Sequence, residues 1–336
     1  MAATTFKGEI VKSYLEKFSQ TKHLTLAKKI KAETGLVFDT VEQVRAMIRH
    51  YTGSIGDKSR KTLGDRRFMR NETVQSTNNK YDLPESDSLS YPIFKIPRAQ
   101  NSILVCGDIH VPEHDVDAIT AMVDWAREHK INTVLLNGDL IDNHHLSYFM
   151  KDPRKKRFVE EREMLWRVLD VLQNALPNAV FYYKAGNHTE RYESYLMTKA
   201  PEIFDTEEYN FDILMRFGER SITYIGDKIR IKAGKLSCLH GHEVIGGGAN
   251  VVNPARYIFL KTKESTIVNH FHQTSEHTEP TLSGDIITCY SVGCLCSLNP
   301  QYNPTARWNH GFARVLVDEN DDYKVFNARV YNGKVL

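Results

Sequence analysis

The chain has 336 residues and a net charge of +2, and 41% of its residues are hydrophobic. This composition predicts a globular protein with a full-sized core, organised as one large domain or as one domain and a smaller module. It argues against a membrane protein, because no apolar run reaches the length of a bilayer span, and the first residues lack the apolar core of a secretion signal. The five cysteines are an odd number and several lie within apolar runs, which indicates buried free thiols in a reducing, cytoplasmic location.

The charge is distributed unequally along the chain. Residues 1–80 contain ten lysines, six arginines and eight acidic residues, which gives this segment a net charge of +8 and leaves −6 for the remainder. The sequence therefore predicts a basic N-terminal module beside an acidic body.

Residues 8–52 have the apolar spacing of short helices. Gly35 is expected to end one helix, and Asp39 or Thr40 to cap the next. With lysines and arginines nearby, the pair resembles a helix-turn-helix. The alternative is a small helical bundle whose charges are solvated, and this is favoured because no recognition residue can be identified.

A second basic stretch, residues 53–70, has no clear periodicity and is expected to be an arm or an exposed connector. Residues 71–90 are rich in Asn, Ser, Thr and Asp and are predicted to form a linker. The expected domains are therefore a basic helical module at 1–70, the linker, and a catalytic domain at 91–336.

Strands and helices alternate at the start of the catalytic domain. The predicted strands are 102–106, 133–136 and 179–183, and the predicted helices between them are 118–128 and 158–175. This order implies parallel pairing. The second half consists mostly of predicted strands with few helices, at 221–225, 229–232, 236–239, 267–268, 286–290, 312–317 and 324–331. The expected fold class is α/β: two packed mixed β-sheets flanked by helices, an α/β/β/α sandwich, with a small N-terminal helical module.

Five clusters of acidic, amide and imidazole side chains each follow a short apolar run. They are Gly107-Asp108-Ile109-His110, Gly138-Asp139-Leu140-Ile141-Asp142, Gly186-Asn187-His188, His240-Gly241-His242 and His270-Phe271-His272. Because catalytic groups of α/β sheets gather beyond the carboxyl ends of the strands, these clusters are expected to converge. Their mixed ligands suit Mn, Fe, Zn or similar ions better than Ca or Mg, and a bridging carboxylate would create a dinuclear metal centre.

The order of the clusters resembles the calcineurin-like metallophosphoesterase family over about residues 100–330. The motifs of that family run Asp-x-His, Gly-Asp-x-x-Asp, Gly-Asn-His, a strand-end His, and Gly-His-x-His. The first three match well. The fifth departs, because Asn269 stands where the family usually has Gly and Phe271 fills the variable position, so the local turn geometry is an open question.

The resemblance implies how seven ligands are shared between two divalent ions. One ion would be held by Asp108, His110 and His272. The other would be held by Asn187, His240 and His270. Asp139 would bridge the two ions.

The resemblance also implies that His188 is not a ligand but protonates the leaving oxygen or steadies the phosphoryl group. The chemistry of phosphoesters agrees with this division. Two cations would neutralise the phosphoryl oxygens and lower the pKa of a bridging water, which creates hydroxide. The departing alkoxide needs a proton, and an imidazole titrates in the right range.

Further groups near the clusters have two interpretations each. Asp142 would orient a ligand histidine or cap a turn. Arg191 would bind a phosphate oxygen or remain solvated at the surface. Asn143 and His144, followed by His145, would line the substrate entrance or form a plain loop. His242 is not chosen as a ligand and is placed beside the substrate.

Other features are ambiguous in the same way. Gly246-Gly247-Gly248 lacks the ending of a phosphate-binding loop and would form a flexible lip or a loose turn. The Cys294-Leu295-Cys296 pair would bind metal only with further ligands, and no second cysteine pair exists to complete a site. Aromatic residues near the motifs would stack nucleic-acid bases or pack against the sheet; they are Tyr148, Phe149, Tyr192 and Tyr195.

The expected function is metal-dependent hydrolysis of phosphoric esters, with manganese as one of the expected ions. The basic module favours a polyanionic substrate, so a phosphodiesterase or nuclease acting on DNA, RNA or nucleotides is the leading hypothesis. One alternative is a phosphatase of phosphoproteins or small phosphomonoesters, since fold and metal site fix the reaction but not the substrate. Another is a non-catalytic DNA-binding adaptor with a structural metal site.

Overall fold

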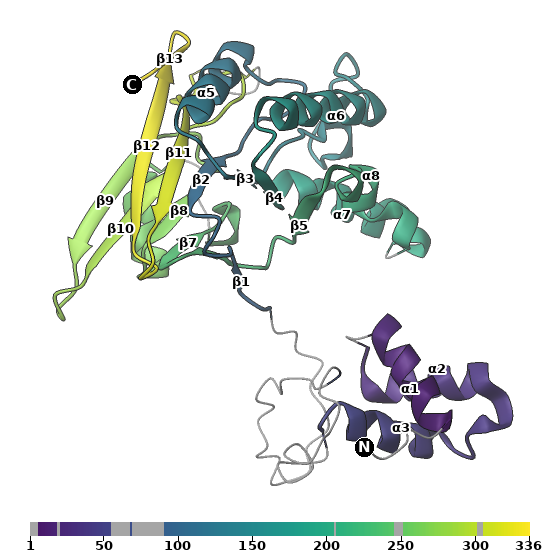
Figure 1. Ribbon diagram of the computed structural model, residues 1–336. Helices are drawn as coiled ribbons and strands as arrows, with labels where there is room; N and C mark the ends of the chain where they lie inside the picture. Colours follow the sequence, from purple (N-terminus) through teal and green to yellow (C-terminus); the bar gives the residue numbers. More distant parts are fainter. Residues whose placement is uncertain are drawn as a thin grey trace. The chain divides into compact units, whose positions relative to one another are not determined.

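The computed structural model forms two compact units, Met1–Ser88 and Leu89–Leu336, which are described separately (Figure 1). The residues that the structure describes are 6–18, 21–54, 68, 91–204, 206–244, 251–300 and 305–336. Three sequence predictions concern segments that lie wholly or largely outside these residues: the basic stretch 53–70, the linker 71–90, and the lip Gly246–Gly248. None of the helices in the described ranges has the length and hydrophobicity to cross a bilayer.

The described residues of the N-terminal unit form three helices and a 3-10 turn: α1 (Phe6–Lys17), α2 (His23–Thr34), η1 (Gly35–Val37) and α3 (Val41–Tyr51). Gly35 ends α2 with a φ of 59°, and the Thr40 side chain accepts a hydrogen bond from Gln43 N at 3.1 Å, so both predicted helix boundaries are confirmed. The sequence did not separate α1 from α2. Apolar residues from all three helices, among them Leu15, Leu26 and Ile48, form one core with Phe38, which follows η1.

The larger unit is built on two mixed β-sheets. The seven-stranded sheet has the order β13-β12-β11-β2-β3-β4-β5. Its strands are β2 (Ser102–Cys106), β3 (Thr133–Asn137), β4 (Val180–Lys184) and β5 (Ile222–Ile225), which are parallel, and β11 (His310–Val317), β12 (Tyr323–Tyr331) and β13 (Lys334–Val335), which are antiparallel. The predicted parallel pairing of the first three strands is therefore confirmed.

The six-stranded sheet has the order β1-β6-β7-β8-β10-β9. Its strands are β1 (Phe94–Lys95), β6 (Ile231–Ala233), β7 (Leu236–Cys238), β8 (Thr266–Val268), β10 (Ile286–Ser291) and β9 (Ser275–Pro280). Strands β7 and β8 are parallel neighbours, so their carboxyl ends meet at one edge of this sheet. The sequence missed β1, which has two residues, and β9, a polar edge strand.

Helices flank the two sheets (Figure 1). They are α5 (Val116–Glu128), α6 (Phe158–Ala175), α7 (Asn187–Lys199), α8 (Phe211–Leu214) and α9 (Pro254–Thr262). Short 3-10 turns connect other elements: η2 (His144–Leu146), η3 (Pro201–Ile203), η4 (Glu207–Tyr209), η5 (Gly218–Arg220) and η6 (His242–Val244). Of the longer helices, α6 has the predicted bounds and α5 begins two residues earlier than predicted, whereas α7 and α9 were not predicted.

Alternate residues of β2 reach different cores. Leu104 and Cys106 pack with residues of α5 and α6, whereas Ile103 and Val105 pack with residues of the six-stranded sheet. Both faces of the strand are therefore covered, which explains its continuous apolar sequence. Residues of α9 pack against Val268 and Cys289 of the six-stranded sheet. The layers are thus helix, sheet, sheet and helix, as the sequence predicted.

The five cysteines are all buried and free. They lie in β2, β7, β10 and the segment after β10, and none forms a disulfide. The prediction of buried free thiols is therefore confirmed.

Candidate metal centre

The five polar clusters follow strands of both sheets and meet at one place. Asp108 and His110 follow β2, Asp139 follows β3, and Asn187 and His188 begin α7 directly after β4. These three strands are parallel neighbours in the seven-stranded sheet. From the other sheet, His240 follows β7, and His270 and His272 follow β8. Each sheet therefore contributes ligand-type side chains from the carboxyl ends of adjacent parallel strands.

His240 lies between Asp139 and Asn187. Its Nε2 atom is 3.1 Å from Asp139 Oδ2 and 3.2 Å from Asn187 Oδ1. Its Nδ1–H donates to Asn137 O at 2.8 Å. Because a carbonyl oxygen only accepts, Nδ1 carries a proton, and Nε2 is the nitrogen that faces the oxygen atoms of Asp139 and Asn187. His270 belongs to the same group, since its ligand atom and those of Asp139 and His240 lie within 4.8 Å of one another.

Asp108, His110 and His272 form the other half of the centre. His272 Nε2 lies 3.3 Å from Asp108 Oδ1 and 3.3 Å from His110 Nε2. His110 Nε2 is 3.8 Å from Asp108 Oδ1. Ligand atoms of Asp108, His110 and Asp139 also lie within 4.8 Å of one another, so Asp139 contacts both halves, as a bridging ligand must.

The fully buried carboxylate of Asp108 shows that these residues fit a cation. Its Oδ2 atom accepts a hydrogen bond from His270 N at 2.8 Å, but Oδ1 has no hydrogen-bond partner among the described residues. Leaving such an atom unsatisfied costs free energy, and a positive ion at the imidazole nitrogens would remove that cost.

The electrostatics of the centre also favour positive charge. Burial alone would raise the pKa of Asp139, but His240 and His188 hold it well below its usual range. Burial alone would lower the pKa of His240, but Asp139 and Asp108 raise it to about 10. Asp139 therefore stays negatively charged, and His240 retains a proton whose positive charge a bound metal ion would replace.

Two motif glycines are required by close approach to the ligands. A Cβ atom at Gly138 would lie 2.0 Å from His240 Nδ1, and a Cβ atom at Gly186 would lie 2.3 Å from Asp139 Oδ1. Gly138 also has a φ of +92°, which an L side chain rarely adopts. The glycines in the second and third clusters thus leave the space that the His240 and Asp139 side chains occupy.

Asn269 replaces the usual glycine of the fifth cluster without backbone strain. It is absent from the residues with positive φ, whereas His270 and His272 have φ values of 60° and 57°. The Asn269 side chain accepts a hydrogen bond from Asn137 Nδ2 at 2.9 Å. The turn therefore forms with Asn at this position and both histidines in the centre.

His188 lies beside the ligands and is held by Asp142. Its Nδ1–H donates to Asp142 O at 2.8 Å, and Nδ1 is 3.1 Å from Asp142 Oδ1. The ring therefore directs Nε2 toward Asp139, whose Oδ2 atom is 3.8 Å away. Asp142 Oδ1 also lies 3.8 Å from His110 Nδ1, the contact expected of a carboxylate that orients a ligand histidine.

The other predicted residues near the centre contact protein groups. Arg191 Nη1 donates to Asp142 O at 2.8 Å. Asn143 is buried and donates to His188 O at 2.7 Å, and His144 Nε2 accepts from Asp152 N at 2.9 Å. These contacts hold the loop after Asp142 in place. His242 Nε2 is 3.3 Å from Glu190 Oε1.

The aromatic residues near the motifs separate into two groups. Tyr192 is buried and packs beside Phe158, so it belongs to the core. Tyr148 and Phe149 are 92% and 67% exposed, and their rings stack with centroids 4.8 Å apart. Tyr195 is partly exposed and faces Lys151 Nζ.

Sequence reasoning missed a buried ion pair behind His240. Lys184, at the end of β4, is fully buried, and its Nζ atom lies 2.9 Å from Glu243 Oε1. Glu243 accepts hydrogen bonds from His240 N at 3.2 Å and Gly241 N at 2.7 Å. The pair therefore positions the backbone that carries His240. A lysine ending the apolar run Phe181-Tyr182-Tyr183 was the available signal.

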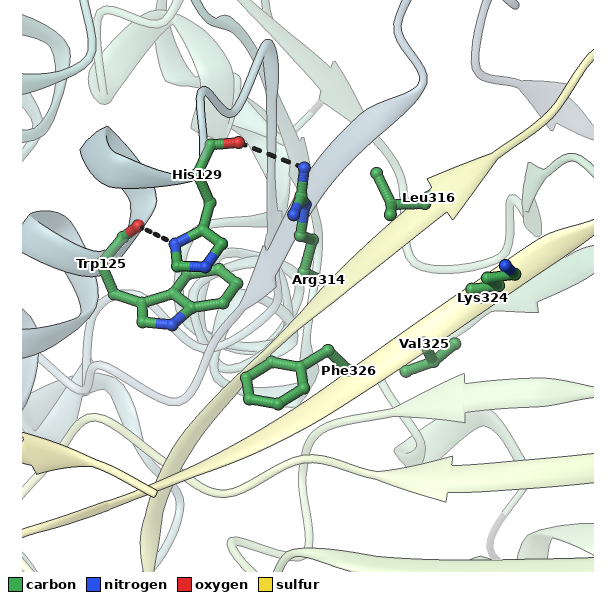
Figure 2. Close-up of a pocket in the computed structure, with 7 residues that line it drawn as sticks. All are labelled: Trp125, His129, Arg314, Leu316, Lys324, Val325 and Phe326. Atoms are coloured by element: carbon green, nitrogen blue, oxygen red, sulfur yellow. Dashed lines mark hydrogen bonds between the residues drawn. The ribbon is translucent and has the colours of Figure 1, made fainter.

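The pocket in Figure 2 is separate from the metal centre. This cavity of about 270 Å³ lies between α5 and the strands β11 and β12. It is lined by Trp125, His129, Arg314, Leu316, Lys324, Val325 and Phe326. None of these is a predicted site residue, and Trp125 already stacks on His129 with ring centroids 3.7 Å apart.

A model of a known protein family matches more than half of the chain. The family model of calcineurin-like phosphoesterases matches residues 102–299. None of the curated proteins matches the chain. A solved structure of a Vps29 single mutant from Entamoeba histolytica is 17% identical, with a TM-score of 0.35, and the match covers 70% of this chain and 96% of that one. A dimetal phosphatase from Danio rerio is 9% identical, with a TM-score of 0.35 and coverage of 68% and 99%. Yfce, a phosphoesterase from E. coli, is 11% identical, with a TM-score of 0.33 and coverage of 67% and 98%.

Proposed function

The chain belongs to the calcineurin-like phosphoesterase family, and from this premise we propose that it hydrolyses phosphoesters with two divalent ions. The observation that carries the proposal is the fully buried Asp108 carboxylate, whose Oδ1 atom faces imidazole nitrogens without a hydrogen-bond partner among the described residues. A buried charge with this environment needs a cation.

Seven residues would hold the ions. Asp108, His110 and His272 would bind one of them. Asn187, His240 and His270 would bind the other. Asp139, which has neighbours in both groups, would bridge. When bound, two such ions stabilise the charge on phosphoryl oxygens as Lewis acids and activate water for attack.

His188 would act as the general acid in this reaction. Because Nδ1–H is engaged by Asp142 O, a second proton on Nε2 would be the one transferred to the leaving alkoxide oxygen. The carboxylate of Asp142, 3.1 Å from Nδ1, would keep the ring in this orientation. Arg191, which also contacts Asp142, would support this arrangement or turn toward a phosphate oxygen.

For the substrate, we propose a phosphodiester of a nucleic acid or nucleotide. Two features support this choice. The exposed Tyr148–Phe149 pair lies on the loop that follows Asp142, the residue that contacts His188, and stacked aromatic rings bind bases. The N-terminal segment has a net charge of +8 over residues 1–80, which suits a polyanion. In this proposal residues 1–70 form a nucleic-acid-binding module, 71–90 a linker and 91–336 the catalytic domain of a cytoplasmic nuclease.

Hydrolysis of two model substrates tests the reaction. Chelated full-length protein, reloaded with Mn²⁺, Fe²⁺ or Zn²⁺, should cleave bis-p-nitrophenyl phosphate faster than p-nitrophenyl phosphate, and the chelated protein should cleave neither. Cleavage of the monoester alone would overturn the diester assignment in favour of a phosphatase. No turnover with any divalent ion, together with salt-sensitive DNA binding, would favour a non-catalytic adaptor.

The aromatic pair has its own test. Tyr148→Ala/Phe149→Ala should weaken binding of single-stranded DNA by roughly tenfold or more, since stacking contributes about 1–3 kcal/mol per base. Hydrolysis of bis-p-nitrophenyl phosphate should change little. Tyr331→Ala, an exposed tyrosine on β12, is the matched control. If the double variant and the control bind DNA with equal affinity, the aromatic pair is not part of the binding site.

Charge substitutions test the role of the N-terminal unit. Lys28 and Arg49 are exposed on α2 and α3. Their joint replacement by Gln should weaken DNA binding and reduce the slope of log K against log salt by about two. Replacement of exposed Arg329 and Lys334 in the larger unit is the control. An unchanged slope in the first variant would contradict DNA binding by these helices.

A further inference from the structure

Cys296 lies beside two histidines of the metal centre. His110, His272 and Cys296 each offer one ligand atom, and these three atoms lie within 4.8 Å of one another. All three residues are buried. Asp108 Oδ1 lies 3.3 Å from His272 Nε2 and has no hydrogen-bond partner among the described residues. A thiol and two imidazoles are therefore close enough to share one ion, and an unsatisfied carboxylate oxygen lies against one of these imidazoles.

The backbone around Cys296 is fixed against the loop that carries two of these ligands. Leu295 N donates to Asp108 O at 3.1 Å, and Ser297 N donates to Glu113 O at 2.7 Å. The residues on both sides of Cys296 are thus tied to the segment after β2. The thiol is therefore in place beside the histidines, and no loop movement is needed to bring it there.

We propose that Cys296 is a thiolate ligand of the ion held by Asp108, His110 and His272. This inference rests on the proposed function, because it concerns the same metal centre. A thiolate is a soft ligand, and sites that combine sulfur with imidazole favour Zn²⁺ or Fe²⁺ over the harder Mn²⁺ and Mg²⁺. Binding releases the thiol proton to solvent, and a sulfur lone pair forms the bond to the ion.

The two halves of the centre then differ in chemistry. The half formed by Asn187, His240 and His270 offers only nitrogen and oxygen atoms, and the bridging Asp139 carboxylate adds only oxygen. The half that includes Cys296 adds sulfur. The centre would therefore take a thiophilic ion in one position, while the other position accepts a wider range of divalent ions.

Cys294 is the natural control for this assignment. It is a buried thiol two positions away, but its Sγ atom lies 3.7 Å from Asn309 O and 3.9 Å from Cys296 O, so it donates to backbone carbonyls. Cys294 is not among the residues whose ligand atoms lie within 4.8 Å of one another at His110 and His272.

The spectrum of the Co²⁺-loaded full-length protein tests the proposal. Bonds between thiolate and Co²⁺ give an intense charge-transfer band in the near ultraviolet, which nitrogen and oxygen ligands do not. The wild type should show this band, Cys294→Ala should keep it, and Cys296→Ala should lose it. The preference for Zn²⁺ over Mn²⁺ in a competition assay should fall by roughly tenfold or more in Cys296→Ala.

A measurement on the wild type avoids dependence on the folding of the variants. X-ray absorption of the Zn²⁺-loaded protein should contain a sulfur neighbour at about 2.3 Å. Absence of both sulfur and the charge-transfer band in the wild type would overturn the proposal even if the protein hydrolyses phosphoesters. A band that persists in Cys296→Ala and disappears in Cys294→Ala would also overturn it. If sulfur binds the ion but the protein hydrolyses no phosphoester, Cys296 remains assigned as a metal ligand and the proposed function is wrong.

Discussion

Gly186→Ala tests whether the position of Asp139 determines metal binding. A Cβ atom at residue 186 would lie 2.3 Å from Asp139 Oδ1 and 2.8 Å from Asp139 N, closer than real Cβ atoms approach other heavy atoms. The φ of Gly186 is −115°, which alanine adopts freely, so the effect is steric alone. Asp139 Oδ1 also accepts a hydrogen bond from His188 N at 2.9 Å, which limits how the carboxylate can move away.

The expected magnitude follows from these contacts. Displacing a ligand from its supporting hydrogen bonds typically lowers metal affinity by roughly 10–100-fold, and we expect a loss in this range. Overpacking a buried site should lower the free energy of unfolding of the chelated protein by about 1–3 kcal/mol. Titration calorimetry with Zn²⁺ measures the first effect, and urea unfolding in the presence of chelator measures the second.

Gly218→Ala is the matched control, because a Cβ atom there has no heavy atom within 4 Å and Gly218 does not have a positive φ. This variant should bind metal as the wild type does. If Gly186→Ala also binds both ions with affinities within about twofold of the wild type, glycine at residue 186 is not needed to position the Asp139 carboxylate.

Three further predictions concern residues around the ligands. His188→Ala should lower kcat by roughly 10²–10⁴-fold while metal analysis still finds two ions, and an unchanged kcat would exclude a general acid at this position. Lys184→Met leaves Glu243 buried without its partner and should lower the free energy of unfolding by about 3–5 kcal/mol. The double variant Lys184→Met/Glu243→Gln should recover part of this loss. If the effects of the two substitutions simply add in urea unfolding, the two side chains do not stabilise each other. Burial raises the pKa of Glu161 from 4.5 to about 8, so the folded chain retains a proton that the unfolded chain loses, and stability should fall as pH rises through this interval. Glu161→Gln should remove that fall in melting temperature for the chelated protein, whereas exposed Glu163→Gln should keep it.

Strands β2, β3 and β4 could be predicted because each is a short apolar run that is almost entirely buried. Helix α7 was missed although three of its buried residues, His188, Tyr192 and Leu196, are spaced by four. Only one of these is aliphatic, so the pattern resembled a polar loop. Helix α9 begins at Pro254, with the Asn253 side chain accepting a hydrogen bond from Arg256 N, a boundary signal that the sequence analysis did not use.

The ligand clusters could be predicted for a related reason: every one of them follows a strand. Cys296 could not be placed in the same way. Its partners, His110 and His272, come from segments that follow β2 and β8, and only the pairing of sheets and loops brings them together. A cysteine pair in a sequence points to further cysteines as its partners, whereas the residues near Cys296 are histidines. Lys184 and Glu243 were missed because neither belongs to a recognisable motif, and their role depends on burial.

Asn137 connects the two sheets at the candidate metal centre. It is the last residue of β3 in the seven-stranded sheet, yet its side chain donates to Leu239 O at 2.7 Å and to Asn269 Oδ1 at 2.9 Å, both beyond strand ends of the other sheet. Its carbonyl oxygen accepts from His240 Nδ1. One residue therefore fixes the ends of β7 and β8 relative to Asp139, two positions further along the chain. Asn269, the departure from the family motif, supplies one acceptor of this connection, which a glycine could not. Asn269 thus adds a hydrogen bond between the two sheets, at the place where side chains from both sheets must be held at fixed positions relative to one another.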